Sequence, residues 1–229
     1  PVWAHEKNKC LPEFVTSLED RMKLILEFAE LNIKHDTGGP FAAGVFERDS
    51  GRPVVIGVNR VVASRCSSAH AEVMALSLAQ QILGTYDLGS SSTVYQLVVN
   101  WLPCAMCFGA TCWSGIRSLA IAGSGPELED ITGFDEGPIH PQWPEQLAKR
   151  GIEVVNNVCR EEALAVYRLF AASNNLVYNA RQGGVSGEHF VEDSFVQQVS
   201  IPEQKVFDGR PFPLTLSPKD GSICLTNKD

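Results

Sequence analysis

Hydrophobic residues recur with helical spacing in two long stretches of the first half of the chain. Between residues 18 and 33 they fall at every third or fourth position, which predicts a helix with one buried stripe. A second stretch, residues 69–83, stops at Gly84, a residue type that commonly ends helices. The same spacing predicts further helices at residues 103–113, 143–149 and 160–172.

Short apolar runs of the kind that form strands lie between these helices. Residues 42–46 and 54–58 flank an Asp-Ser-Gly turn at 49–51, which predicts a β-hairpin. Three more runs alternate with the later helices, as expected for buried strands of one sheet. They are residues 94–99, 119–122 and 152–155. The order of elements predicts an α/β fold, a three-layer α/β/α sandwich around a mixed sheet of about five strands.

The same patterning divides the chain into three parts. Residues 1–17 lack periodicity and are expected to form an N-terminal arm, whereas residues 18–182 hold all the predicted elements. Residues 183–229 begin with a glycine-rich stretch, carry several prolines and contain few aliphatic clusters. They are therefore expected to form a separate C-terminal extension.

Composition narrows the class of protein and its partners. The 229 residues carry a formal net charge of −8 and no dense run of lysine and arginine, which argues against a nucleic-acid partner. No apolar stretch is long enough to span a bilayer and no secretory leader is evident, so we expect a cytoplasmic protein without membrane contact. The seven cysteines are odd in number and irregularly spaced, which favours reduced thiols and a metal site over a disulfide framework.

Two short motifs place metal-binding side chains at the starts of two predicted helices. His70 opens the first helix, and Cys104 and Cys107 lie one turn apart at the start of the second. Zinc prefers imidazole and thiolate ligands, and three protein ligands leave a fourth position for water, as in catalytic sites. The positive end of the helix dipole also favours thiolate over thiol at the two cysteines. We therefore predict one zinc ion per chain.

Glu72, two residues beyond His70, is the predicted proton carrier of this site. At this spacing its carboxylate can reach the fourth position and move protons between water, a ring nitrogen and departing ammonia. H-x-E followed by P-C-x-x-C is the signature of zinc nucleobase deaminases. Alone, the C-x-x-C pair could be a redox pair or half of a structural zinc site, and a lone histidine is more often structural. Each of the two motifs opens a predicted helix after a predicted strand, and together they favour a catalytic centre.

Five segments of the chain carry a family resemblance. They are GGPFAAGVF (38–46), GVNRVV (57–62), SSAHAEVMALSLA (67–79), PCAMCFGATCWSG (103–115) and GFDEGP (133–138), and YNAR at 178–181 follows them. Together they resemble the guanine deaminase branch of the cytidine deaminase superfamily, above all bacterial guanine and ammeline deaminases. The resemblance implies a zinc-dependent aminohydrolase of purine metabolism that acts on the C–N bond of a cyclic amidine, with guanine or a guanine-like base as substrate.

The resemblance also implies how such a ring would be held. Asn59 matches an asparagine that hydrogen-bonds the acceptor edge of the purine, and the backbone of Ala71 matches a further contact. Phe41 and Trp113 match aromatic residues that bracket the ring. Structural roles remain open, because Asn59 could simply form a turn and the two aromatic residues could belong to the core.

The same resemblance implies roles for residues nearer the C-terminus. Glu136 matches an acidic residue that approaches the amino group as a second proton carrier, with Asp135 the weaker candidate and an exposed loop acid the alternative. Such enzymes form dimers with exchanged C-terminal segments. In that arrangement Tyr178 or Asn179 would close the pocket of the partner.

One departure from the family pattern lies beside the metal motif. Family members usually carry a glutamate just before Pro-Cys, where this chain has Asn100-Trp101-Leu102. An indole and an aliphatic side chain in this place should reshape the wall around the substrate. We therefore expect Trp101 to narrow or cap the pocket, and we hypothesise that the substrate is a guanine-like ring other than guanine itself.

Two alternatives to a free-base deaminase remain at this stage. A nucleoside or tRNA-base deaminase would share the motifs, although the net charge of −8 counts against a tRNA substrate. A catalytically silent zinc-containing scaffold of a larger fusion would have no need of Glu72. Residues 201–221 faintly resemble the opening of taurine-dioxygenase-like iron enzymes, which motivates the fusion hypothesis, with an ordinary extension as the alternative.

Overall fold

The computed structural model describes residues 1–173, 175–179, 214–216 and 223–225. The chain divides into two compact units, Pro1–Phe195 and Val196–Asp229. In the second unit, β6 (Leu214–Leu216) and β7 (Ile223–Leu225) pair antiparallel. The rest of the predicted extension, including most of its dioxygenase-like segment, lies outside the described residues, so the fusion hypothesis stays a prediction.

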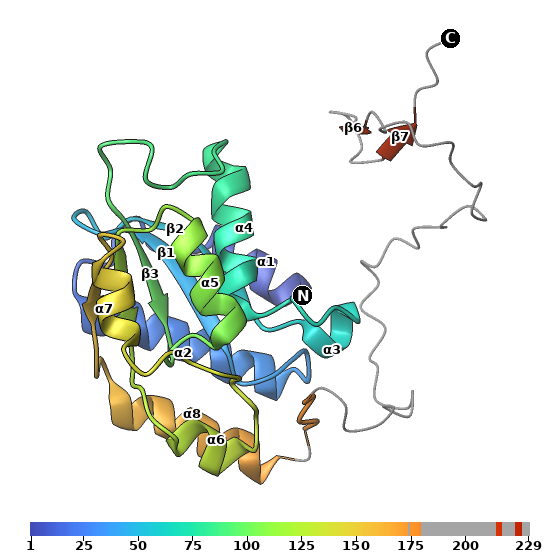
Figure 1. Ribbon diagram of the computed structural model, residues 1–229. Helices are drawn as coiled ribbons and strands as arrows, with labels where there is room; N and C mark the ends of the chain where they lie inside the picture. Colours follow the sequence, from blue (N-terminus) through green and yellow to red (C-terminus); the bar gives the residue numbers. More distant parts are fainter. Residues whose placement is uncertain (174, 180–213, 217–222, 226–229) are drawn as a thin grey trace, which may run out of the picture. The chain divides into compact units, whose positions relative to one another are not determined.

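A five-stranded mixed sheet lies at the centre of the first unit (Figure 1). Its strands are β1 (Ala42–Glu47), β2 (Pro53–Val58), β3 (Tyr95–Val99), β4 (Ser118–Ile121) and β5 (Glu153–Val155). They follow the order β2-β1-β3-β4-β5. β1 pairs antiparallel with β2 and β3, whereas β3, β4 and β5 run parallel. The predicted hairpin, strands and mixed sheet are confirmed.

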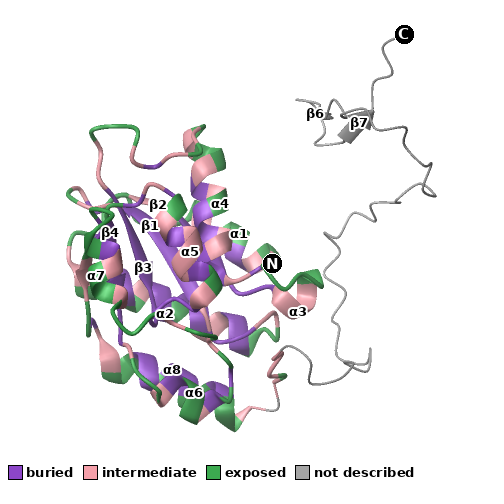
Figure 2. Ribbon diagram, in the orientation of Figure 1, coloured by how far each residue is buried: buried purple, intermediate pink, exposed green. Residues whose placement is uncertain are grey.

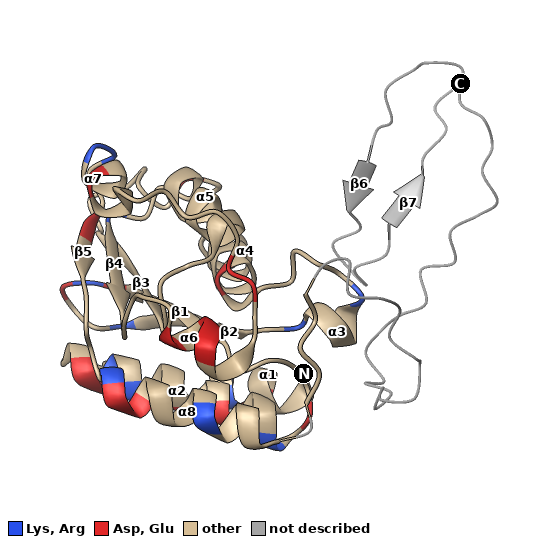
Figure 3. Ribbon diagram, turned by 60° about the horizontal axis from the view of Figure 1, so that its bottom comes forward, with Lys and Arg blue, Asp and Glu red and all other residues tan. Residues whose placement is uncertain are grey.

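Helices cover both faces of this sheet. They are α1 (Val2–Lys9), α2 (Leu18–Lys34), α3 (Val61–Ser64), α4 (Ala71–Leu83), α5 (Ala105–Trp113), α6 (Glu127–Thr132), α7 (Trp143–Ala148) and α8 (Arg160–Ala172). Figures 1 and 3 show α2 and α8 side by side on one face, with α4 and α5 on the other. This arrangement confirms the predicted three layers. In the described part of the chain no helix is both long and apolar enough to cross a membrane.

Local sequence explains the long helix of the first layer. Ser17 caps α2, because its side-chain oxygen accepts the backbone N–H of Asp20 at 3.0 Å. In the apolar stripe of α2, Met22, Ile25 and Phe28 are fully buried. The strands contribute the other side of the core, and Figure 2 shows buried residues concentrated on the sheet and on the inward sides of the helices.

The N-terminus is a helix and not the arm that the sequence predicted. The side chain of Asn8 in α1 donates to the carbonyl of Ile56 at 2.9 Å and accepts its N–H at 2.8 Å. Ile56 lies in β2, an outer strand whose backbone would otherwise have unpaired groups. Trp3 packs on Phe28 of α2, with ring centroids 5.8 Å apart. Tertiary contacts thus stabilise a helix whose own sequence lacks periodicity.

The position of α4 depends on a glycine in β2. A Cβ atom on Gly57 would lie 2.6 Å from the backbone nitrogen of Ala75 and 2.8 Å from the carbonyl oxygen of Ala71. No other residue type fits this distance without displacing the helix. The close approach fixes the N-terminus of α4, where His70 and Glu72 are located.

Candidate active site

Three metal-ligating side chains converge at the N-termini of α4 and α5. His70 is the N-cap residue of α4, Cys104 is the N-cap residue of α5, and Cys107 lies in the first turn of α5. Their ligand atoms all lie within 4.8 Å of one another, and Nδ1 of His70 is 3.5 Å from Sγ of Cys104. Among the described residues this is the group of histidine, cysteine and carboxylate side chains that could hold a metal ion.

The donor set fits zinc. One imidazole nitrogen and two sulfur atoms are ligands that zinc binds in a tetrahedron, with one position left over. The hydrogen bond from Cys107, aided by that from His70, lowers the pKa of Cys104 to about 4, so this sulfur is readily a thiolate. The same contact and burial raise the pKa of Cys107. A dication among these atoms would stabilise both thiolates together.

A cavity of about 360 Å³ opens onto these ligands. His70 and Cys104 line it together with two carboxylate residues, Glu72 of α4 and Glu136 of the loop after α6. Its volume lies in the range of small-molecule sites. No lysine or arginine is among the described residues that line it.

Both carboxyl groups hold protons more firmly than usual. Burial raises the pKa of Glu72, and the negative charge of Cys104 raises it further. Burial likewise raises the pKa of Glu136 to about 9, with Cys104 and Glu72 adding to the effect. Such displaced pKa values are typical of groups that transfer protons during catalysis.

Several residues expected at the substrate do lie at this cavity. Phe41, Trp101, Asp135 and Tyr178 line it. Trp101 is almost completely buried, and whether it narrows the pocket for a substrate stays a prediction. These placements agree with the expectations, whereas the roles of the four side chains remain predictions.

Asn59 and Ala71 lie behind the cavity wall. Asn59 is fully buried, and its amide oxygen accepts the backbone N–H of Val61 at 3.3 Å. Its amide nitrogen donates to the hydroxyl of Tyr178 at 2.5 Å. Asn59 therefore contacts a residue that lines the cavity, and Ala71 is buried at the start of α4.

Trp113 corrects one expectation. It ends α5 with 88% of its surface exposed and does not line the cavity of its own chain. It is therefore neither core nor a bracket for a ring bound in this chain's cavity. The helical pattern alone could not tell a core position from a cavity or surface position, because it shows on which face of the helix a residue lies but not what covers that face.

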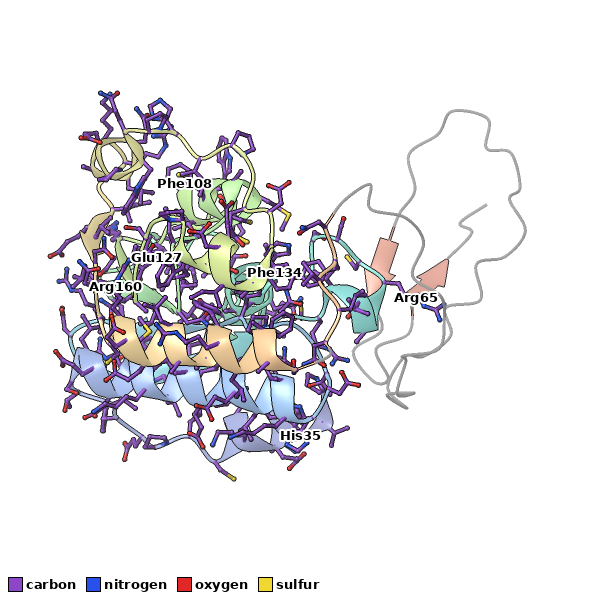
Figure 4. All side chains as sticks on the ribbon, turned by 90° about the horizontal axis from the view of Figure 1, so that it is seen from below. His35, Arg65, Phe108, Glu127, Phe134 and Arg160 are labelled. Atoms are coloured by element: carbon purple, nitrogen blue, oxygen red, sulfur yellow. The ribbon has the colours of Figure 1, made fainter. Side chains whose placement is uncertain are left out.

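Phe134 is a cavity residue that the sequence reasoning missed (Figure 4). It is buried between Phe41 and Tyr178, with ring centroids 5.1 Å and 4.8 Å away. The available signal was its place in the GFDEGP segment, directly before the two acidic candidates. Together the three rings form an aromatic side of the cavity.

Tyr178 and Asn179 line the cavity of their own chain. The side chain of Asn179 accepts the backbone N–H of Asp135 at 2.9 Å and donates to the carbonyl of Gly133 at 2.7 Å. Tyr178 adds its hydrogen bond to Asn59. These contacts fix the segment within one chain, whereas the resemblance implied closure of a partner's pocket.

Comparison with known proteins decides the family. Residues 15–122 match the cytidine and deoxycytidylate deaminase zinc-binding region. A guanine deaminase of Nitrosomonas europaea shares 46% identity over 76% of this chain and 94% of its own, with a TM-score of 0.72. The structure of NE0047 in complex with 2,6-diaminopurine shares 47% identity over 79% and 95% of the chains, with a TM-score of 0.73.

The chain belongs to the cytidine and deoxycytidylate deaminase family. It is a zinc-dependent hydrolytic deaminase, as its motifs predicted. The guanine deaminase of Bacillus subtilis (strain 168) is 29% identical over 134 residues, which are 58% of this chain and 81% of that protein. A tRNA:A34 deaminase at 22% identity and a TM-score of 0.51 shares the fold of this deaminase.

Proposed function

We propose that this deaminase hydrolyses guanine or a closely related free base and releases ammonia. The observation that carries the proposal is the cavity itself, which combines the zinc ligands, two carboxyl groups with raised pKa values and an aromatic side. The absence of lysine and arginine from its described lining disfavours a phosphorylated nucleotide or a polynucleotide. Relatives at 46% and 29% identity are guanine deaminases, which supports the choice of ring.

Hydrolysis needs an activated water and a series of proton transfers. Zinc, when bound, lowers the pKa of a coordinated water so that hydroxide is available near neutral pH. Glu72 accepts the proton that the attacking water gives up and delivers it to a ring nitrogen. Glu136 donates a proton to the amino group as its C–N bond breaks. Ammonia leaves, the ring carbon becomes a carbonyl, and the proton of the added hydroxyl returns to the Glu136 carboxylate.

The remaining cavity residues would hold the ring. Phe41 and Phe134 offer aromatic faces for stacking, and Trp101 limits the space at one end. The Asn59 amide could bind the edge of a ring only if its hydrogen bond to the Tyr178 hydroxyl were broken. We therefore propose that Asn59 and Tyr178 act together in binding the ring. Asp135 is exposed at the rim and would contact the substrate from outside.

We also propose a homodimer that forms over α4 and α5. These two helices carry one charged residue, Glu72, and that residue is buried, whereas α2 and α8 carry many (Figure 3). Ile82 and Trp113 expose 61% and 88% of their surfaces on this layer. Uncharged helices with exposed apolar side chains are typical of interfaces. If the protomers exchanged C-terminal segments, the cavity contacts that Tyr178 and Asn179 make in their own chain would be made by the same segment of the partner.

A cytoplasmic enzyme of purine metabolism is the setting that we propose. Cys10 and Cys66 expose free thiols, which a reducing compartment keeps intact. Guanine is a free base of purine turnover, so its hydrolysis would belong to that metabolism.

The proposal is tested by ammonia release from guanine, guanosine, ammeline, cytosine, cytidine and adenine, compared between the wild type and Glu72→Gln. We expect release from guanine or its close analogue, and a fall in kcat of about 10²–10⁴-fold in Glu72→Gln at equal zinc content. The isosteric amide keeps the shape of the side chain and removes the proton acceptor. Efficient guanine hydrolysis would refute the hypothesis that the substrate is another ring, and unchanged activity of Glu72→Gln would refute the mechanism.

A further inference from the structure

A second cavity of about 450 Å³ lies behind the wall of the catalytic cavity. Four residues line both cavities: Trp101, Leu102, Glu136 and Gly137. Trp101 has the largest side chain of the four, and it is 3% exposed. The indole is therefore the main body of a partition between two spaces that would otherwise adjoin.

The indole is held on several sides. Its Nε1 donates to the carbonyl of Gly125 at 3.3 Å, and its ring meets that of Tyr167 edge-on at 5.6 Å. A Cβ atom on Gly123 would lie 2.6 Å from Cζ3 of the indole, so only glycine leaves room for the ring there. Trp101 thus occupies one defined orientation.

Arg160 of α8 holds the remaining face. Its guanidinium carbon lies 4.9 Å from the centroid of the Trp101 ring, which is cation–π distance. The guanidinium donates to Glu127 at 2.5 Å and to the carbonyl of Ser124 at 3.3 Å (Figure 4). These bonds fix the guanidinium over the indole, so Arg160 is a positioning residue that acts through Trp101.

The second cavity offers polar groups to whatever enters it. Glu129, Glu136 and His140 line it, together with Trp143. Carboxylates and an imidazole accept hydrogen bonds from hydroxyl groups. If the indole were absent, the hydroxyl groups of a sugar attached to a ring nitrogen would find hydrogen-bond partners there.

We propose that Trp101, held by Arg160, separates the catalytic cavity from an adjoining cavity that could hold a hydroxylated ring substituent, and so restricts the enzyme to free bases. This inference rests on the proposed function, and it assigns the selectivity for free bases over nucleosides to the Trp101 indole. The preference for base over nucleoside is then a steric property of the wall and not of the zinc centre. Removing the indole joins the two cavities and admits a ribosylated ring.

The test compares kcat/KM for guanine and guanosine in the wild type, Trp101→Ala, Trp101→Phe, Arg160→Met and Arg160→Lys. We expect the preference for guanine to fall at least about tenfold in Trp101→Ala, the size of effect that a change in pocket shape produces. Trp101→Phe should keep it within about threefold. Arg160→Met should lower the preference for guanine partly, by decreasing the KM for guanosine. Arg160→Lys should retain the preference of the wild type, because a cation still faces the indole.

Two further measurements separate this inference from the proposed function. Dialysis binding of guanine and guanosine to Glu72→Gln, with and without Trp101→Ala, requires no turnover, so it reports on the wall even if guanine is not hydrolysed. A crystal structure of Trp101→Ala should show one continuous cavity. An unchanged base preference in folded, zinc-containing Trp101→Ala, or two cavities that stay separate in its crystal structure, would overturn the inference.

Discussion

Glu72 and Glu136 face one cavity from different parts of the chain, and burial raises the pKa of both. A proton-carrying role for Glu72 could be predicted from the sequence, because its two-residue spacing from His70 is a property of a single helix start. Glu136 was recognised only through the resemblance of its loop. Its burial beside the metal ligands depends on the fold, since its carbonyl accepts the N–H of Ala105 at 3.0 Å.

Glu136→Gln should inactivate the enzyme and also change how its stability depends on pH. The amide cannot donate the proton that departing ammonia needs, so we expect kcat to fall about 10²–10⁴-fold with KM little changed. The folded wild type keeps the Glu136 proton up to a pKa of about 9, whereas the unfolded chain loses it near 4.5. The stability that this proton gives is therefore present at low pH and is lost as pH rises between these values.

The measurement for this variant is thermal unfolding of the zinc-free proteins at pH 5 and pH 8, beside steady-state kinetics of the zinc-loaded proteins. Glu136→Gln has no carboxyl group to ionise, so its stability relative to the wild type should be greater at pH 8 than at pH 5. An equal difference at both pH values would show that the Glu136 pKa is not raised in the folded protein.

At the scale of elements, the N-termini of α4 and α5 bring together ligands that are more than thirty residues apart in sequence. The hydrophobic periods predicted both helices and all five strands, because long stripes and buried runs reflect which side faces the core. The short α3 and α6 were not predicted, and α1 was taken for an arm. Its stability comes from Asn8 on the edge strand and Trp3 on α2, which are tertiary contacts.

Gly57→Ala should displace α4 and impair the metal site at the same time. The added methyl would overlap backbone atoms of Ala71 and Ala75, so we expect a loss of about 1–3 kcal/mol in the free energy of unfolding and lower zinc content. Urea denaturation and metal analysis measure the two effects. Gly109→Ala is the matched control, because a Cβ there meets nothing within 4 Å and alanine favours the α5 helix by about 0.5–1 kcal/mol. Equal stability of the two variants would contradict this account of α4.

At the scale of the whole molecule, the two outer layers differ in character. The layer of α2 and α8 carries charges of both signs, as expected of a helix surface in water (Figure 3). The layer of α4 and α5 exposes Ile82 and Trp113 without charged residues beside them on these helices. The sequence showed both compositions, but only the fold showed that α4 and α5 pack together as one layer.

Trp113→Glu should convert the proposed dimer into a monomer. A charge in the centre of an apolar interface is costly to bury, so we expect sedimentation to report the 25.0 kDa chain in place of about twice that mass. Leu169→Glu, at a 39% exposed position on α8, is the control and should leave the dimer intact. A wild type that sediments as a monomer, or a Trp113→Glu variant that stays dimeric, would refute the interface.

The sequence by itself predicted the zinc ligands and the α/β order of elements, and it pointed to Glu72 as the proton carrier that we propose. Each depends on spacing within one helix start or on the local period of apolar residues, and both are properties of short segments. Only the tertiary structure decided which aromatic residues meet the cavity, because Trp113 and Phe134 differ in what covers them and not in their own patterns. It likewise decided that Trp101, held by Arg160 from α8, stands between two cavities, since long-range packing creates that contact.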